Sequence, residues 1–361
     1  MNESALLKSE RILLIRMLSV KDAATIGVAA FRHFRQAFPD SHIDFLTFGD
    51  GVDIIKLIDP DITTSSLPAH AWPNDLLVAI EAFLGLAEKI IPNQYSQIVN
   101  LDTAFMPCFL ARFLHDAGEN VAGNMLNISV QSLFSQFKEQ SLKPEFVQST
   151  EYYMQSTFSG MSRLHSRWWD TQQQFDAGFT EFYLRECCGF KNIDIDIRIP
   201  TEHLPAAKSP IFLNDKGNSG VQDSIEHPKT IALCLADAHD GYAYPYVLEL
   251  KHVLEAKGYR VWSNAQSKLP LLEMLSKVSA ADLVVTKPGE SQWYGTAVGC
   301  LTLLISASES PLLSMPDYAT EQTERCPVHC PFTQSNHEQC CCDKPEELAD
   351  GIESIFTELS R

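Results

Sequence analysis

The sequence has no long hydrophobic stretch, since none of its apolar runs approaches the roughly 20 residues that a membrane-spanning helix needs. The first residues, MNESALLKSERILLIRML, contain acidic side chains and no small-residue cleavage site, so we expect no signal peptide. These two absences favour a cytoplasmic protein, in which thiols stay reduced and disulfides are rare.

Positive charge is also scarce. The chain has 28 Lys and Arg against 46 Asp and Glu, a formal net charge of -18, and both halves are acidic. A basic surface for nucleic acid is therefore not expected. The acidity also argues against electrostatic attachment to an anionic membrane, although a peripheral position at the inner membrane face stays open.

The 361 residues contain no internal repeat and no low-complexity tract, and this length favours two domains. Strand-like and helix-like patterns alternate in both halves, which is typical of parallel α/β sheets covered by helices. The expected strands are 11–20, 42–49, 95–102, 120–126, 193–200, 230–237, 259–264, 282–289 and 301–306. The expected helices are 21–40, 51–58, 76–91, 107–118, much of 129–189, 245–258, 269–281, 290–299 and 345–359.

The domain boundaries follow from composition. We expect an N-terminal domain over 1–205 and a linker rich in Pro, Gly, Ser and Asn over 206–228. A C-terminal domain over 229–344 and a terminal helix over 345–361 complete the chain. Ligands of open α/β sheets bind beyond the carboxyl ends of the strands, so the residues after each strand are the functional candidates.

Two such loops contain candidate groups. Asp22 lies at the start of the helix after the first strand, where a carboxylate is stabilised as the anion and could act as a general base. The alternative is a helix-terminal charge without chemistry, which is the commoner case for a residue at this position. Gly289 follows a strand of the second half and would let backbone N–H groups approach a diphosphate, or it simply makes a tight turn.

Four blocks together resemble glycosyltransferase family 9, the ADP-heptose:lipopolysaccharide heptosyltransferases and their relatives. They are RILLIRMLSVKDAATIGVAAFRHFRQAFPDSHIDFLT, YSQIVNLD, ADLVVTKPGESQWYGTAVGCLTLLI and the cysteine-rich stretch that precedes KPEELADGI. Their order and spacing cover nearly the whole chain. The resemblance implies a GT-B fold, which is two Rossmann-like domains with a cleft between them.

The resemblance also implies the chemistry. A heptose-like sugar would move, with inversion, from a nucleotide diphosphate donor (an ADP-sugar first) to a hydroxyl of a lipopolysaccharide-type glycan, glycolipid or protein. Asp22 falls on the family's catalytic base, and no cofactor is required. The implied donor-binding residues are Ala236, Tyr242, Lys287, Gly289, Glu290, Ser291 and Gln292. The expected acceptor-binding residues are Arg16, Lys21, Asn100, Asp102, Arg163 and Arg167.

The chain departs from the family at several of these positions. Lys21 replaces a Gly before the base, Lys287 replaces an Asp, and Tyr242 stands where the family tends to have a Lys. Lys287 would restore a positive charge beside a diphosphate. An alternative function is therefore a catalytically silent GT-B protein that acts as a binding or assembly partner.

Half of the ten cysteines lie within residues 326–342. The spacing is not that of a paired C-x2-C zinc ribbon, but several thiolates could converge on a structural Zn or Fe. The expected ligands are Cys326, Cys330, Cys340 and Cys342. Reduced free thiols or a disulfide are the alternatives.

Overall fold

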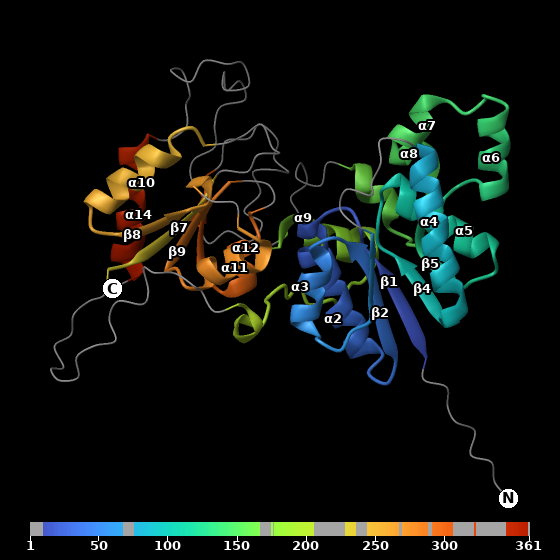
Figure 1. The fold of residues 1–361 in the computed structure, drawn as a ribbon, viewed down its shortest axis with the longest axis horizontal. Coiled ribbons are helices and arrows are strands. Elements are labelled where there is room, and N and C mark those ends of the chain that lie inside the picture. The colour runs from blue at the N-terminus through green and yellow to red at the C-terminus, as the bar shows by residue number, and fades with distance from the viewer. Residues whose placement is uncertain are drawn as a thin grey trace, which may run out of the picture. The chain divides into compact units, whose positions relative to one another are not determined.

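The computed structural model describes residues 10–67, 76–166, 175, 177–205, 228–235, 244–266, 269–287, 291–305, 321–322 and 344–359. The chain divides into two compact units. Residues up to Ile197 form the N-terminal unit, apart from a short segment at 176–178, and Arg198 begins the C-terminal unit. Each unit contains its own sheet flanked by helices (Figure 1), so the α/β class predicted from the sequence is confirmed.

The N-terminal sheet has the strand order β3-β2-β1-β4-β5-β6. The strands are β1 (Arg11–Ile15), β2 (His42–Phe48), β3 (Thr64–Leu67), β4 (Gln97–Asn100), β5 (Val121–Leu126) and β6 (Met154–Ser156). All pairs are parallel except β5 with β6. Ile15 pairs with both Leu46 and Asn100, so β1, β2 and β4 end at a common edge.

Helices pack on both faces of this sheet. They are α1 (Val20–Asp22), α2 (Val28–Ala37), α3 (Gly51–Ile58), α4 (Leu76–Ile90), α5 (Phe105–Asp116), α6 (Val130–Lys138), α7 (Pro144–Gln148), α8 (Thr150–Tyr153) and α9 (Gly178–Glu181). Leu13 and Ile15 pack with Phe83 of α4 and Phe109 of α5 in one core. Alternate side chains of β1 point to the opposite face of the sheet.

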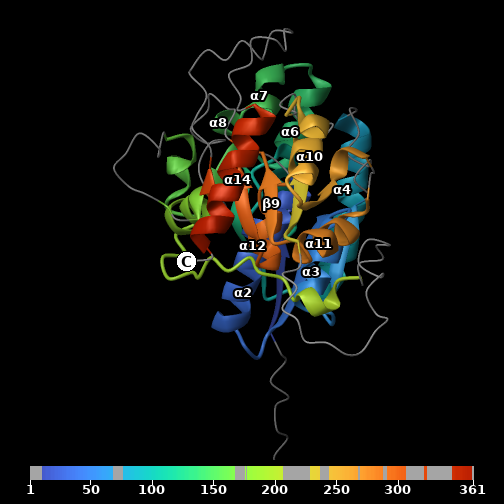
Figure 2. The same ribbon diagram turned by 90° about the vertical axis from the view of Figure 1, so that its left-hand side faces the viewer.

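The C-terminal sheet has the order β11-β10-β9-β7-β8, and all its pairs are parallel. The strands are β7 (Thr230–Cys234), β8 (Arg260–Ser263), β9 (Leu283–Thr286), β10 (Leu301–Leu304) and β11 (Glu321–Gln322). The helices are α10 (Val247–Ala256), α11 (Leu271–Ser279), α12 (Tyr294–Val298) and α14 (Pro345–Leu359). Helices α10 and α14 lie together against one face of the sheet (Figure 2). None of the helices among the residues that the model describes is both long and apolar enough to cross a membrane.

Two sequence expectations need correction. Residues 193–200 form no strand, although Ile193, Ile197 and Ile199 are buried in the expected alternation. The Ile199 N–H bonds instead to the carbonyl of Ala297, at a helix end. Alternating burial therefore arose without a neighbouring strand to complete a ladder. Residues 129–189 are only partly helical: β6 lies within them and pairs with β5, which precedes them.

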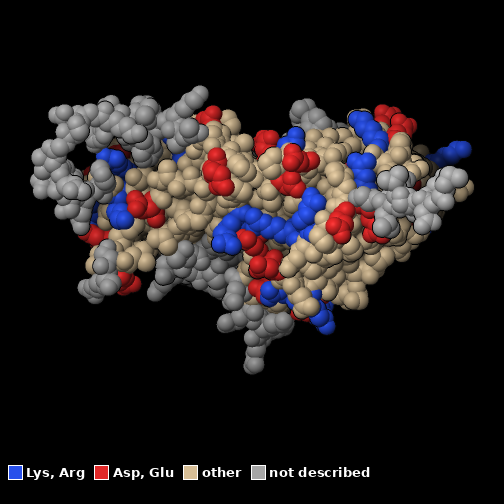
Figure 3. All heavy atoms as spheres, turned by 90° about the horizontal axis from the view of Figure 1, so that it is seen from below, with Lys and Arg blue, Asp and Glu red and all other residues tan. Residues whose placement is uncertain are grey.

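Basic and acidic side chains lie close to one another on one face of the molecule. Figure 3 shows Lys and Arg next to Asp and Glu on the face seen from below, with uncharged residues over most of that face. Arg32 pairs with Asp196 at 2.9 Å, and Arg35 pairs with Asp59 at 2.8 Å. Surface pairs of this kind stabilise a fold little, but they disperse the charge.

Candidate functional site

The strongest candidate site lies where β1 ends and the next helix begins. Ser19 is the N-cap of that helix, which runs through α1, a π-helical turn at Ala23–Gly27 and α2. The backbone N–H of Asp22 donates a hydrogen bond to the Ser19 hydroxyl at 3.1 Å. The same hydroxyl donates a hydrogen bond to Oδ2 of Asp22 at 2.7 Å. This reciprocal bonding resembles a capping box and fixes the carboxylate of Asp22 at the helix N-terminus.

Arg16 lies beneath Asp22 and forms an ion pair with its Oδ1. The Arg16 side chain is almost fully enclosed, at 2% exposure, whereas the Asp22 side chain is 17% exposed. Arg16 also donates to the carbonyl of Leu101 at 2.6 Å, and its guanidinium carbon lies 5.3 Å from the centre of the Tyr183 ring. The buried cation thus holds the Asp22 carboxylate from the inside while part of Asp22 still faces solvent.

A network of buried hydrogen bonds surrounds the residues that Arg16 contacts. The Tyr183 hydroxyl donates to the carbonyl of Leu101 at 2.7 Å and accepts from the Asn124 amide at 3.1 Å. Asp102 accepts from the backbone N–H of Met17 at 2.6 Å, which ties the chain after β1 to the chain after β4. Because these groups are buried and bonded, the network fixes the position of Arg16.

Asn100 and Asp102 are wholly buried within this network. The Asn100 side chain accepts from the Asp102 N–H at 3.0 Å and donates to the carbonyl of Asn124 at 2.7 Å. Asp102 also accepts from the N–H of Ala104 at 2.9 Å. The structure therefore brings Arg16, Asp22, Asn100 and Asp102 together, with Asp22 the most exposed of the four.

The electrostatics keep Asp22 ionised. Burial alone would raise the pKa of its carboxyl, but the charge and hydrogen bond of Arg16, helped by Ser19 and Lys21, outweigh burial and lower the pKa. Burial would likewise lower the pKa of Arg16, but Asp22, Asp102 and Tyr183 raise it, so the guanidinium stays charged. Burial also raises the pKa of Tyr183 well above its usual value, so this phenol stays protonated.

The other expected acceptor residues are more dispersed. Lys21 precedes Asp22 in α1 and is half-buried. Arg163 lies on a short 3-10 helix (Met161–His165), is 59% exposed and pairs with Glu186. Arg167 lies outside the described residues.

On the donor side, three of the expected residues are described. Ser291 is buried, and its hydroxyl lies 2.7 Å from that of Thr286 and 3.1 Å from the carbonyl oxygen of Cys234. These bonds join the chain after β9 to the end of β7. Lys287 and Gln292 are buried as well, each 2% exposed.

Several expected residues lie outside the described part of the chain: Ala236, Tyr242, Gly289 and Glu290 on the donor side, and the metal-ligand candidates Cys326, Cys330, Cys340 and Cys342. Within the described ranges, no group of three or more His, Cys, Asp or Glu side chains could hold a metal ion. Cys108, Cys187, Cys188, Cys234 and Cys300 are free thiols.

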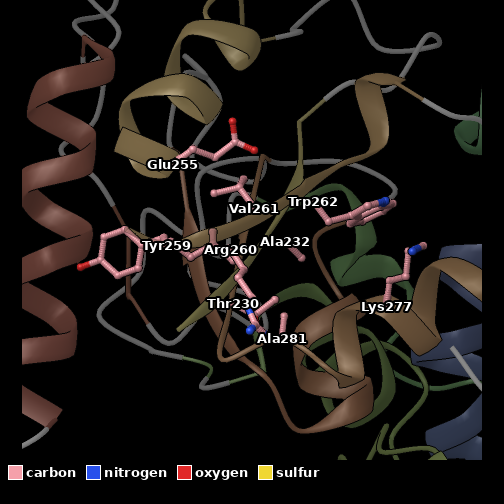
Figure 4. Close-up of a pocket in the computed structure, with 10 residues that line it drawn as sticks. Thr230, Ala232, Glu255, Tyr259, Arg260, Val261, Trp262, Lys277 and Ala281 are labelled. Atoms are coloured by element: carbon pink, nitrogen blue, oxygen red, sulfur yellow. The ribbon is translucent and has the colours of Figure 1, made fainter. Parts of the chain in front are cut away.

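The C-terminal unit also has a cavity of about 270 Å³ (Figure 4), and none of the described donor-side residues lines it. It is lined by the first residues of two strands, Thr230 of β7 and Arg260 of β8, and by Glu255 near the end of α10. Trp262 and Lys277 also line it, with the ammonium 5.6 Å from the ring centre. The cavity therefore reaches the amino ends of the strands, whereas the donor-side residues follow their carboxyl ends.

Sequence reasoning missed two members of the N-terminal network, Tyr183 and Asn124. Tyr183 lies on a π-helical turn (Phe182–Cys187), and its bond to Leu101 spans 82 residues. No local pattern could have revealed that contact. Ser19 could have been identified as an N-cap from the sequence, because a Ser three residues before an acidic residue at the start of a helix is a capping signal.

The comparisons with known proteins bear on the fold. No protein-family model matches the sequence, and no curated protein matches it. A glycosyl transferase family 9 structure from Veillonella parvula DSM 2008 matches with a TM-score of 0.61 at 11% identity, covering 97% of each chain. E. coli heptosyltransferase WaaC with ADP matches with a TM-score of 0.57 at 12% identity, covering 96% of this chain and 99% of that one.

A third structure, E. coli ADP-heptose lps heptosyltransferase II, matches with a TM-score of 0.53 at 11% identity and covers 97% of this chain and 100% of that chain. At such low identity the likeness establishes the fold. The chain has the GT-B fold of two Rossmann-like domains, so the resemblance predicted from the sequence blocks is confirmed at the level of the fold.

Proposed function

We propose that this chain is a glycosyltransferase that moves a sugar from a nucleotide diphosphate donor to an acceptor hydroxyl. The observation that carries the proposal is the ionised, partly exposed carboxylate of Asp22, fixed at the end of β1 by Arg16 and Ser19. The fold adds support, because the structures it resembles over nearly their whole length are named as glycosyltransferases.

In the proposed reaction Asp22 acts as general base. It accepts a hydrogen bond from the acceptor hydroxyl and takes its proton as the oxygen forms a bond to the anomeric carbon of the sugar. The bond from that carbon to the donor diphosphate breaks on the opposite side, the electron pair leaves with the nucleoside diphosphate, and the configuration inverts. Arg16 does not touch the substrate in this scheme; it positions Asp22 and keeps it ionised.

The acceptor side of the proposal rests on the N-terminal unit. Lys21 precedes Asp22 directly, and Arg163 and Arg167 are further cations that would suit phosphate or carboxylate groups of an acidic glycan, glycolipid or protein. Asn100 and Asp102 would act indirectly, because their side chains hold the backbone beneath the site. We propose a lipopolysaccharide-type glycan as the first acceptor to test.

The donor side rests on the C-terminal unit, with Lys287, Ser291 and Gln292 as its described members. The WaaC structure contains ADP, so an ADP-sugar with a heptose-like sugar is the first donor to test. We propose that groups of the protein stabilise the leaving diphosphate, so that the transfer needs no cofactor.

A screen of ADP-, GDP-, UDP- and dTDP-sugars tests the function. Each compound is added to the full chain, and both the melting temperature and the release of nucleoside diphosphate with and without a glycan acceptor are measured. We expect one nucleotide class to raise the melting temperature and to be released faster when the acceptor is present. If no compound is turned over, the transferase proposal is wrong.

A second candidate function is a catalytically silent binding or assembly protein. It is favoured by the bonding of Asp22, because the ion pair with Arg16 and the hydrogen bond from the N-cap Ser19 give this carboxylate a structural role that needs no reaction. In that case a nucleotide sugar would raise the melting temperature without being consumed, or would have no effect at all. The same screen therefore separates the two functions.

A further inference from the structure

The described lysines of the C-terminal unit differ sharply in their surroundings. Lys287, which follows β9 directly, is 2% exposed, and its Nζ has no hydrogen-bond partner in the described structure. The other described lysines of this unit each contact a carboxylate or an aromatic ring; they are Lys229, Lys251, Lys257, Lys277 and Lys344. Among the described residues, Lys287 is thus a buried lysine whose Nζ has no hydrogen-bond partner and no counter-charge.

Such an arrangement is unfavourable unless something compensates for it. An ammonium group removed from water loses its hydration and needs hydrogen bonds or an opposite charge in return. The nearby polar side chain of Ser291 does not supply them, because its hydroxyl is engaged with Thr286 and the carbonyl of Cys234. The missing partner is therefore best explained as an anionic ligand.

The position of Lys287 in the sheet supports this explanation. From β7 the chain crosses to β8 on one side, whereas β9 pairs with β7 on the other side, so the order reverses between β7 and β9. Thr286 pairs with Cys234, which places Lys287 at the carboxyl edge of this reversal point. In open α/β sheets, ligands bind in the crevice outside the strands at that point.

Helix α10 adds a second favourable feature at the same edge. It follows β7 and runs for ten residues from Val247, and its N-cap residue Tyr246 makes no side-chain capping bond. The N-terminus of a helix carries partial positive charge and N–H groups that suit an anion. A lysine and a helix N-terminus at one sheet edge are the elements of a phosphate site.

We propose that Lys287 is the cation of a phosphate subsite that takes the diphosphate group of a nucleotide. The identification of that nucleotide as a sugar donor rests on the proposed function, whereas the anion site stands on the residues above. In the transfer reaction, negative charge collects on the departing diphosphate, and a fixed buried cation stabilises it there more strongly than an exposed one would.

The test uses the full chain with ADP and inorganic pyrophosphate as probes. Binding is measured by calorimetric titration and by thermal shift for wild type, Lys287→Met, Lys287→Arg and the control Lys257→Met. Lys257 is a suitable control because it is an ion-paired lysine of the same unit. At 100 times the Kd, we expect the probe to raise the wild-type melting temperature by about 5 °C.

The expected pattern separates a ligand-binding role from a structural one. Lys287→Met should weaken binding of both probes at least about tenfold, while its melting temperature without a probe stays equal to the wild type or rises, because an uncompensated charge is gone. Lys287→Arg should keep most of the binding, and Lys257→Met should bind like the wild type. Pyrophosphate binding without any gain from ADP would assign the subsite to inorganic pyrophosphate and overturn the nucleotide assignment.

Three results would overturn the subsite itself: wild type that binds neither probe, Lys287→Met that binds as tightly as wild type, or Lys287→Met that fails to fold while Lys287→Arg folds but binds no probe. Failure of the proposed function looks different. If both probes bind through Lys287 and no nucleotide sugar is ever consumed, the phosphate subsite is supported and the proposed transferase function is wrong.

Discussion

The pair of Arg16 and Asp22 should be strongly coupled in stability, and a double-mutant cycle measures this directly. The variants are Arg16→Met, Asp22→Asn and the double variant. With the charges about 4 Å apart and an effective dielectric constant of about 20, their attraction is worth roughly 4 kcal/mol. Because Asp22 is 17% exposed, we expect a coupling of about 2–4 kcal/mol.

Each single variant should lower the free energy of unfolding, and the physical reason differs between the two. Asp22→Asn leaves a guanidinium with 2% exposure without its counter-charge, which costs about 3–5 kcal/mol when a buried pair is broken. Arg16→Met removes the group that lowers the pKa of Asp22, so burial then raises that pKa above its usual value. Calorimetric unfolding measures these effects, and the transition of the N-terminal unit is the one expected to move.

The pH dependence of the folding stability tests whether Asp22 stabilises or destabilises the fold in each protein. In the wild type the pKa of Asp22 is lowered on folding, so its stabilisation is present above about pH 4 and is lost as the pH falls through the folded pKa. In Arg16→Met the folded pKa is raised, so Asp22 destabilises the fold at neutral pH and less so on acidification. The stability gap between the two proteins should narrow from pH 7 to pH 4.

The exposed pair of Arg163 and Glu186 is the matched control. Arg163 is 59% exposed, so the same cycle there should give less than about 1 kcal/mol. A coupling for Arg16 and Asp22 no larger than this control, or a stability gap that widens on acidification, would refute the picture of a buried guanidinium that holds the carboxylate.

Other residues give further predictions. Gly123→Ala should destabilise the N-terminal unit by about 1–3 kcal/mol in urea unfolding, because φ is +92° and a Cβ would strike the backbone of the neighbouring strand; an unchanged midpoint would contradict this. Tyr95→Phe should lower the free energy of unfolding by about 1.5–3 kcal/mol in the same assay, because the hydroxyl donates to the buried carboxylate of Asp44 at 2.6 Å. A loss below about 0.5 kcal/mol, which is typical of an ordinary surface substitution, would contradict this. Burial raises the pKa of Cys187 and of the half-buried Cys300 to about 12, so alkylation at pH 8 followed by mass spectrometry should find Cys187 unmodified and Cys300 modified only slowly in folded protein; early modification of Cys187 would contradict this.

The sequence predicted the regular parts of the fold because those parts depend on local patterns. The strand at Arg11–Ile15 and the helix from Val20 follow from an apolar run and a helical repeat. The strand expected at 193–200 failed because strand formation needs a neighbouring partner, which alternation does not specify. Short strands such as β6 were missed for the same reason, because their pairing is set by distant residues.

The candidate site was predictable in part. Asp22 could be found because it follows a strand and begins a helix. The partnership of Arg16 with Asp22 was not foreseen, because Arg16 was expected to face the acceptor, and the contact of Tyr183 with the chain after β4 spans 82 residues. Lys287 was named only because it replaces an Asp of the donor motif in the resembling family; its burial without a hydrogen-bond partner in the described structure is a property that only packing reveals.

The role of Asp22 as the base of a sugar transfer can be tested by single-turnover transfer from the best donor of the nucleotide-sugar screen. The variants are Asp22→Asn and the matched control Asp53→Asn, since Asp53 is an acidic residue in the first turn of α3. We predict that Asp22→Asn lowers the transfer rate by a factor on the order of 10²–10⁴ while donor affinity and the thermal shift by the donor persist, and that Asp53→Asn transfers like the wild type. Transfer by Asp22→Asn at the wild-type rate would show that Asp22 is not the base.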